Sequence, residues 1–151
     1  EVYLDERLKY ISDIGSLAVY GTRTIIVDMP EGIWETNLLD TLYAIKMADY
    51  EILISHIDRC PEGYVKDLFK LGYKGIIDAS ALLGVPNLLR RNRLFEWMDG
   101  GNIVGVASNF ATDEKRAHEK IMKLHSVLGD RAASLAESSA RYLAGAIQIT
   151  N

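Results

Sequence analysis

A histidine and an arginine follow an apolar run in the segment Ser55-His56-Ile57-Asp58-Arg59. A neutral imidazole can ligate a metal ion, and a guanidinium can hold a phosphate through two parallel hydrogen bonds. In α/β proteins, ligands and catalytic groups gather at the carboxyl ends of the strands. The pair therefore indicates a metal or phosphate site, although a histidine that is only hydrogen-bonded fits the same position equally well.

Polar side chains also stand at the ends of the other predicted strands. Glu1 opens the first strand, Asp28 and Asp78 lie in later ones, and Ser108 and Asn109 end the last. Each of these residues is explained at least as well by a loop cap or a polar strand terminus as by a function.

Three further residues of reactive type have a structural explanation that is the more common one. A lone cysteine such as Cys60 is usually a small apolar filler rather than a nucleophile. His118 and His125 share one face of a predicted helix, where surface or boundary histidines outnumber metal ligands. The sequence contains no glycine-rich phosphate loop and no Gly-x-Ser-x-Gly elbow.

Alternating strands and helices must position these residues. Short apolar runs without polar alternation predict strands that are covered on both faces, at residues 2–4, 24–30, 50–56, 75–79 and 102–108, with an edge pairing at 17–20. Helical periodicity and capping residues predict helices at residues 35–47, 63–71 and 85–98, from an N-cap at Thr112 to about Leu128, and after Asp130. Gly100 and Gly101 are expected to end a helix and turn the chain.

Strand–helix–strand units of this length imply parallel pairing and right-handed crossovers. The predicted fold class is therefore α/β, with a single domain over residues 1–151. Periodicity does not decide between an open sheet and a closed barrel.

Composition excludes several classes of function. A net charge of -4 argues against a nucleic-acid binder, and the basic run at residues 90–93 is typical of a solvated helix face. No apolar run approaches the length of a membrane span. A single cysteine permits no internal disulfide and fits a reducing cytoplasm. The sequence leaves the oligomeric state open.

In their order along the chain, the strand ends resemble the polymerase-and-histidinol-phosphatase (PHP) superfamily, in particular the bacterial capsular tyrosine phosphatases. The family's Ala-His-Pro-Glu-Arg motif resembles residues 55–59, and its Ile-Asn-Ala-Ser-Ser-Leu-Leu-Gly segment resembles residues 77–84. Three further segments resemble the family at the expected places, namely Glu1-Val2, residues 26–30, and residues 107–112 together with Arg116. The order and spacing hold across essentially all of the chain.

This resemblance implies a distorted, TIM-like (β/α)7 barrel that binds divalent metals, typically manganese, at the carboxyl ends of its strands. It implies metal-assisted hydrolysis of phosphotyrosine on the tail of the autokinase that controls polysaccharide export, in the cytoplasm. By position, Glu1 and His56 match metal ligands, and Asn109 falls where the family has a metal-binding aspartate. Arg59 and Arg116 match the arginines that bind phosphate.

The chain also departs from the family pattern. Asn109 replaces the family's aspartate and Ala111 its paired histidine, so the metal site is expected to be degenerate. The family's N-terminal third, with its His-x-His motif, has no counterpart before Glu1, so residues 1–151 are expected to be the C-terminal two-thirds of one PHP-like domain.

Three hypotheses follow. The chain is part of a manganese-dependent tyrosine phosphatase, or a non-catalytic module that binds an anionic partner through Arg59 and Arg116, or a domain whose likeness is limited to fold. As a chain of 151 residues it is expected to be inactive.

Overall fold

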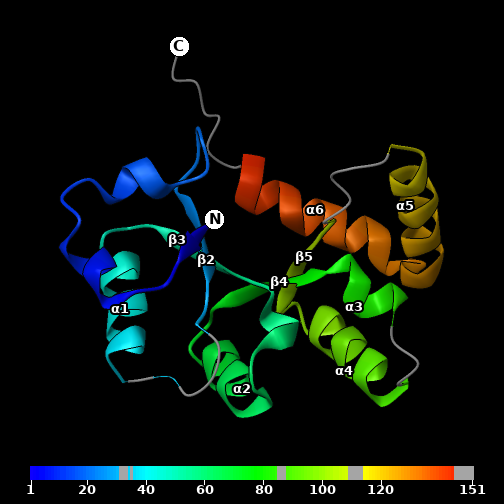
Figure 1. The fold of residues 1–151 in the computed structure, drawn as a ribbon, viewed down its shortest axis with the longest axis horizontal. Coiled ribbons are helices and arrows are strands. Elements are labelled where there is room, and N and C mark those ends of the chain that lie inside the picture. Colours follow the sequence, from blue (N-terminus) through cyan, green and yellow to red (C-terminus); the bar gives the residue numbers. More distant parts are fainter. Residues whose placement is uncertain (31–33, 35, 85–87, 109–113, 145–151) are drawn as a thin grey trace.

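The computed structural model describes residues 1–30, 34, 36–84, 88–108 and 114–144. Five parallel strands form one sheet in the order β1-β2-β3-β4-β5 (Figure 1). The strands are β1 (Val2–Tyr3), β2 (Thr24–Asp28), β3 (Glu51–Ser55), β4 (Lys74–Asp78) and β5 (Ile103–Ala107). This sheet confirms the predicted α/β class and all five predicted strands, each within two residues at either end.

The strand order carries information about architecture. In a doubly wound sheet the order reverses at a switch point, whereas consecutive strands of a TIM-like barrel are neighbours throughout. Here every strand is paired with the strand that precedes or follows it in sequence. The described strands therefore have the arrangement of one arc of a TIM-like barrel, open between β1 and β5.

Helices connect the strands and cover the sheet. They are α1 (Thr36–Met47), α2 (Glu62–Lys70), α3 (Ala79–Leu83), α4 (Leu88–Asp99), α5 (Glu114–Leu128) and α6 (Arg131–Ala144), with three short 3₁₀ helices, η1 (Glu6–Tyr10), η2 (Ile14–Leu17) and η3 (Ile57–Arg59). None of the helices in the described ranges is long and apolar enough to cross a membrane.

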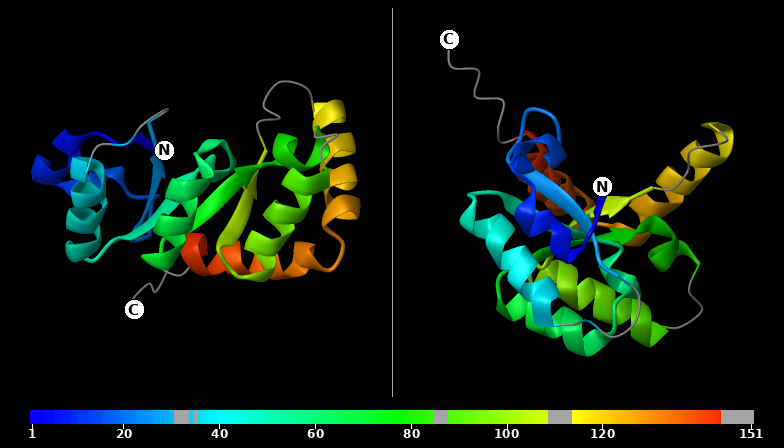
Figure 2. Two further views of the ribbon diagram at one scale, coloured as in Figure 1. Left: turned by 90° about the horizontal axis from the view of Figure 1, so that it is seen from below. Right: turned by 60° about the vertical axis from the view of Figure 1, so that its left-hand side comes forward.

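The last helix, α6, lies across the amino ends of the strands (Figure 2). Ser139 donates a hydrogen bond of 2.6 Å to the carbonyl of Val104, near the start of β5. Thr24, the first residue of β2, donates one of 2.6 Å to the carbonyl of Tyr142. Since α6 occupies the amino edge, the carboxyl edge is left for the candidate site.

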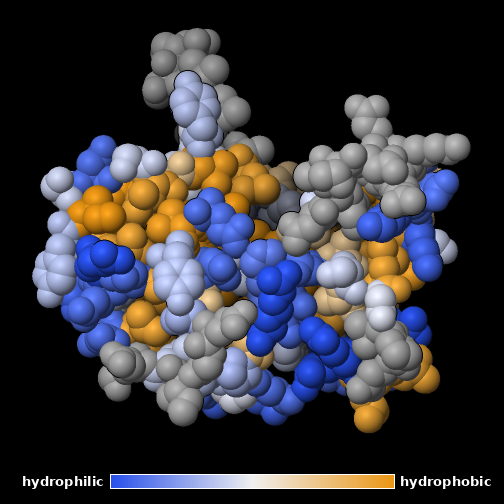
Figure 3. Space-filling view, viewed as in Figure 1, coloured by the Kyte–Doolittle hydropathy of each residue, from blue (hydrophilic) through white to orange (hydrophobic). Residues whose placement is uncertain are grey.

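The core is built around β3, in which every residue after Glu51 is buried. Ile54 and its neighbour in β2, Val27, have no exposed surface. Ile57, just beyond β3, is also fully buried and ties the turn after the strand to the core. On the surface, hydrophilic side chains form a band across the middle of the face in Figure 3, over η3 and α4.

Of two local predictions about turns and edges, one is wrong and the other is confirmed. The edge pairing predicted at residues 17–20 is wrong, because Val19 donates to the carbonyl of Thr24 within a tight turn. The stop at Gly100 and Gly101 is confirmed. Gly101 has a φ of +66°, and the following amide of Asn102 bonds the carbonyl of Trp97 at 2.9 Å, as at a typical helix C-terminus.

The short helix α3 was not predicted. Its residues continue the apolar run of β4, and Ala79, Ala81 and Leu82 are all buried. A run that is buried on every side has no polar period, so a strand and a helix look alike in sequence. The predicted N-cap at Thr112 lies outside the described residues.

Candidate functional site

The turn after β3 presents the histidine and the arginine at the carboxyl edge of the sheet. His56 has φ 48° and ψ 32°, a left-handed conformation that costs a non-glycine residue about 1–3 kcal/mol and that clusters at active sites and ligand clamps. The amide of Arg59 closes the turn on the carbonyl of His56 at 2.8 Å. Buried Ile57 between them holds the turn in place.

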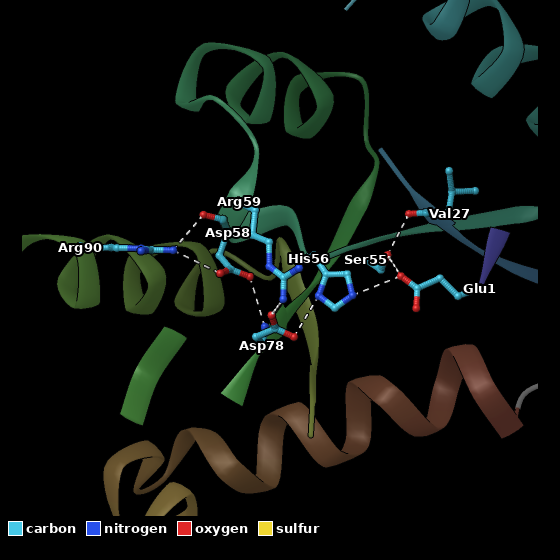
Figure 4. Close-up of polar contacts among 8 residues, drawn as sticks. All are labelled: Glu1, Val27, Ser55, His56, Asp58, Arg59, Asp78 and Arg90. Atoms are coloured by element: carbon cyan, nitrogen blue, oxygen red, sulfur yellow. Dashed lines mark hydrogen bonds and ion pairs between the residues drawn. The ribbon is translucent and has the colours of Figure 1, made fainter. Parts of the chain in front are cut away.

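His56 lies between two carboxylates (Figure 4). Its Nδ1 is 2.9 Å from Oδ1 of Asp78, the last residue of β4, and its Nε2 is 3.3 Å from Oε1 of Glu1. A buried carboxylate can only accept, so Nδ1 carries the proton that is shared with Asp78. The other nitrogen faces Glu1.

Asp78 also binds Arg59, through its second carboxylate oxygen. The Asp78 side chain is only 3% exposed, whereas that of Arg59 is 56% exposed. The hydrogen bond from Arg59 to Asp78 raises the pKa of the guanidinium above its ordinary value. Arg59 therefore stays charged, with one end fixed to a buried anion and the rest open to solvent.

A second buried carboxylate, that of Asp58, supports the first. The backbone amide of Asp78 donates to Oδ1 of Asp58 at 3.1 Å. Arg90 of α4 lies 3.3 Å from Oδ2 of Asp58 and 3.2 Å from its carbonyl oxygen. The basic run at residues 90–93 is thus not a purely solvated face, because Arg90 and Arg93 bind Asp58 and Glu62 respectively.

Glu1 is joined to the same edge by a serine. The hydroxyl of Ser55 lies 2.5 Å from Oε1 of Glu1 and 3.3 Å from the carbonyl of Val27. Because Ser55 precedes His56, the strand end orients the carboxylate and the imidazole together.

An open cleft of about 540 Å³ lies beside this network, which is the size range of small-ligand sites. Its wall combines charged and apolar side chains from β1, β2 and the turn after β3, namely Tyr3, Asp28, Met29, Pro30, His56, Arg59, Cys60 and Pro61.

The structure brings Glu1, His56 and Arg59 together, as the order of the strand ends predicted. Arg116 lies in α5, and its side chain is outside the described part of the structure, as are Asn109 and Ala111. Sequence reasoning noted Asp78 only as a strand end and missed Asp58 and Arg90. The one signal for these residues in the sequence was the position of Asp58 between His56 and Arg59.

Among the described residues, Glu1 and His56 are arranged to share a cation. An unprotonated Nε2 and a carboxylate oxygen are both acceptors, so at 3.3 Å they need a proton or a cation between them. Among the described residues, no three His, Cys, Asp or Glu side chains form a group that could hold a metal. A catalytic zinc site uses three protein ligands and manganese prefers six oxygen or nitrogen donors, so the described residues supply an incomplete set.

Cys60 is expected to be unreactive in the folded protein. Burial, with smaller contributions from Asp28 and Asp58, raises its pKa from 9.0 to about 12, which leaves about 1000-fold less thiolate than in the unfolded chain at the same pH. Alkylation by iodoacetamide should therefore be far slower in buffer than in urea. Equal rates in the two conditions would contradict this assignment.

Comparison with known proteins supports the fold. No protein-family model and no curated protein sequence matches the chain. A solved structure does match, with a TM-score of 0.67 and 19% identity. It comes from the crystal structures of YwqE from Bacillus subtilis and CpsB from Streptococcus pneumoniae, described as unique metal-dependent tyrosine phosphatases. The match covers 87% of this chain and 58% of that one. The chain therefore shares the fold of the matched part of that structure, as its ordered motifs predicted.

Proposed function

We propose that the cleft binds phosphomonoesters, with phosphotyrosine as the ligand class, and that the chain is related in function to the tyrosine phosphatases whose fold it has. The observation that carries this proposal is the placement of Arg59. Its guanidinium is fixed to Asp78 on one side and more than half of its side chain is exposed at the cleft. A guanidinium has five donors in a planar fork, so those not used by Asp78 are free for an anion.

The cleft walls suit the remainder of such a ligand. Tyr3, Met29, Pro30 and Pro61 form apolar surface beside the charged turn. An aromatic ring prefers a wall of this kind, and an aromatic partner adds a specific stacking contact. Phosphotyrosine would place its phosphate at Arg59 and its ring against Tyr3 and the prolines.

Hydrolysis of the ester requires more than binding of its phosphate. A divalent metal would supply an acidified water and charge stabilisation, and the resemblance points to manganese. Among the described residues, Glu1 and His56 would be its ligands, and they are two where several are required. We therefore propose that the metal site is degenerate and that the chain binds the phosphoester without efficient turnover.

The partner included in this proposal is a cytoplasmic protein that carries phosphotyrosine, such as the tail of an autokinase that acts in capsule or exopolysaccharide synthesis. Both the motifs and the fold neighbours support a phosphotyrosine ligand. The charged edge of the sheet supports recognition of its phosphate.

Calorimetry with a tyrosine-phosphorylated peptide and its unphosphorylated twin tests the proposal. The expected result, without added metal, is an affinity at least about tenfold higher for the phosphopeptide, or about 1.4 kcal/mol. Equal affinities would reject phosphoester recognition. The same samples with added manganese should release phosphate no faster than a His56→Ala variant.

Hydrolysis by the chain itself is the second candidate function, and the 3.3 Å approach of Glu1 to His56 favours it. Manganese-dependent phosphate release that disappears in His56→Ala would establish this function and reject the degenerate site.

A further inference from the structure

Asp78 is the residue on which the functional side chains converge. One carboxylate oxygen binds Nδ1 of His56 at 2.9 Å, the other binds Arg59, and the backbone amide donates to Asp58 at 3.1 Å. The Asp78 side chain is 3% exposed and belongs to the strand beside the one that delivers the histidine. Figure 4 shows His56 and Arg59 reaching Asp78 from one turn, with Asp58 between Asp78 and Arg90.

We propose that Asp78 is a positioning residue, which fixes the proton of His56 on Nδ1 and aims Arg59 at the cleft, and that Arg90 acts on both through Asp58. This inference deepens the proposed function, because the part of it that concerns ligand affinity rests on phosphoester recognition. Asp78 need not touch the ligand, because the ligand side of the network is formed by Nε2 of His56 and by the exposed donors of Arg59.

The position of the proton decides what His56 can do. The hydrogen bond made by one ring nitrogen determines which nitrogen is free to act at the site. With the proton on Nδ1, Nε2 is the nitrogen that meets Glu1 and the proton or cation that the two share at the cleft. Without an acceptor at Asp78, the imidazole could carry its proton on either nitrogen, and the cleft side would lose its defined acceptor.

Arg90 extends this network to α4. It binds both the carboxylate and the carbonyl of Asp58, whose side chain is 3% exposed. Asp58 in turn accepts from the amide of Asp78, at the junction of β4 and α3. Arg90 therefore stabilises a buried anion, and its loss would leave Asp58 without that cation next to Asp78.

Nitrogen-15 NMR of labelled histidine reads the tautomer directly and requires no ligand. The chain has three histidines, and His118 and His125 are exposed on α5, where they serve as internal references. Nδ1 of His56 should show the chemical shift of a protonated nitrogen, whereas the references should favour the Nε2–H form that free imidazole prefers. A His56 that matches the references would overturn the proposal.

Two substitutions at Asp78 separate its two contacts. Asp78→Leu removes both acceptors, so His56 should lose the Nδ1–H preference and affinity for the phosphopeptide should fall about 10- to 100-fold. Asp78→Asn retains one acceptor oxygen in a similar shape, so it can serve His56 or Arg59 but not both in their present positions. Either the tautomer or the affinity should then change. A folded Asp78→Asn or Asp78→Leu variant that changes neither would overturn the proposal.

Arg93 provides a matched control for Arg90. Both arginines lie on α4 with side chains of similar exposure, 39% for Arg90 and 37% for Arg93, but Arg93 binds Glu62 outside the network. Arg90→Ala should weaken phosphopeptide binding about three- to tenfold, and Arg93→Ala should change it less than about twofold. Equal effects of the two substitutions would reject the role of Arg90. A wild-type protein that does not bind the phosphopeptide would reject the proposed function, while the tautomer still tests Asp78.

Discussion

The substitution Gly75→Ala is expected to lower the free energy of unfolding by about 1–3 kcal/mol. A Cβ atom there would lie 2.6 Å from Cγ2 of Ile57, 2.9 Å from its Cδ1 and 3.1 Å from its Cβ. Ile57 is fully buried in the turn between His56 and Asp58, and Gly75 pairs with Ile54 and Ile103 inside the sheet. Neither the Ile57 side chain nor the strand that contains Gly75 can move without disturbing the core or the site.

Urea denaturation of single and double variants tests this contact. Ile57→Ala alone should cost about 2–5 kcal/mol, because it leaves a cavity. It also removes the Cγ2 and Cδ1 atoms that clash, so the double variant should be more stable than the sum of the single effects by about 1 kcal/mol or more. Strictly additive effects would show that Gly75 and Ile57 do not meet as described.

Gly63→Ala is a control in which stability is expected to rise rather than fall. Gly63 lies in α2, and a Cβ atom there would meet nothing within 4 Å. Gly63→Ala should therefore stabilise the protein by about 0.5–1 kcal/mol, because alanine loses less conformational freedom in a helix than glycine does.

Loss of the Arg59 guanidinium is expected to weaken phosphopeptide binding about 10- to 100-fold, which is the usual value of a charge-assisted hydrogen bond. Arg59 is the one described arginine on the cleft wall. Arg59→Lys should recover part of the affinity, since an ammonium supplies the charge but not the planar pair of donors. Calorimetry with the phosphopeptide measures both variants.

Arg141 is a suitable control for this experiment. It is 73% exposed and pairs with Glu137 on α6, the helix that crosses the opposite edge of the sheet. Arg141→Ala should leave the affinity within about twofold of wild type, because an exposed charge more than a Debye length from the ligand is screened. Comparable losses in Arg59→Ala and Arg141→Ala would mean that net charge, rather than the cleft, attracts the peptide.

Part of the fold could be predicted because the strands are short, apolar and buried on both faces, which produces continuous runs such as Ile52–Ile54. Helix ends were marked by residues with local physical roles, such as Gly101 with its positive φ. Predictions failed where local signals are ambiguous. The run after Asp78 became a short helix, and residues 17–20 became the end of η2 and the start of a turn.

The sequence by itself determined the class of fold, the positions of the strands along the chain and the placement of Glu1, His56 and Arg59 at strand ends. Those features follow from hydrophobic periodicity and from chain order, which are local or sequential properties. Only the tertiary structure showed that Asp78 lies between His56 and Arg59 and that Arg90 reaches Asp58 from α4. Such contacts depend on the register between neighbouring strands and on how a helix packs over them, and a one-residue shift in register would turn Asp78 to the other face of the sheet.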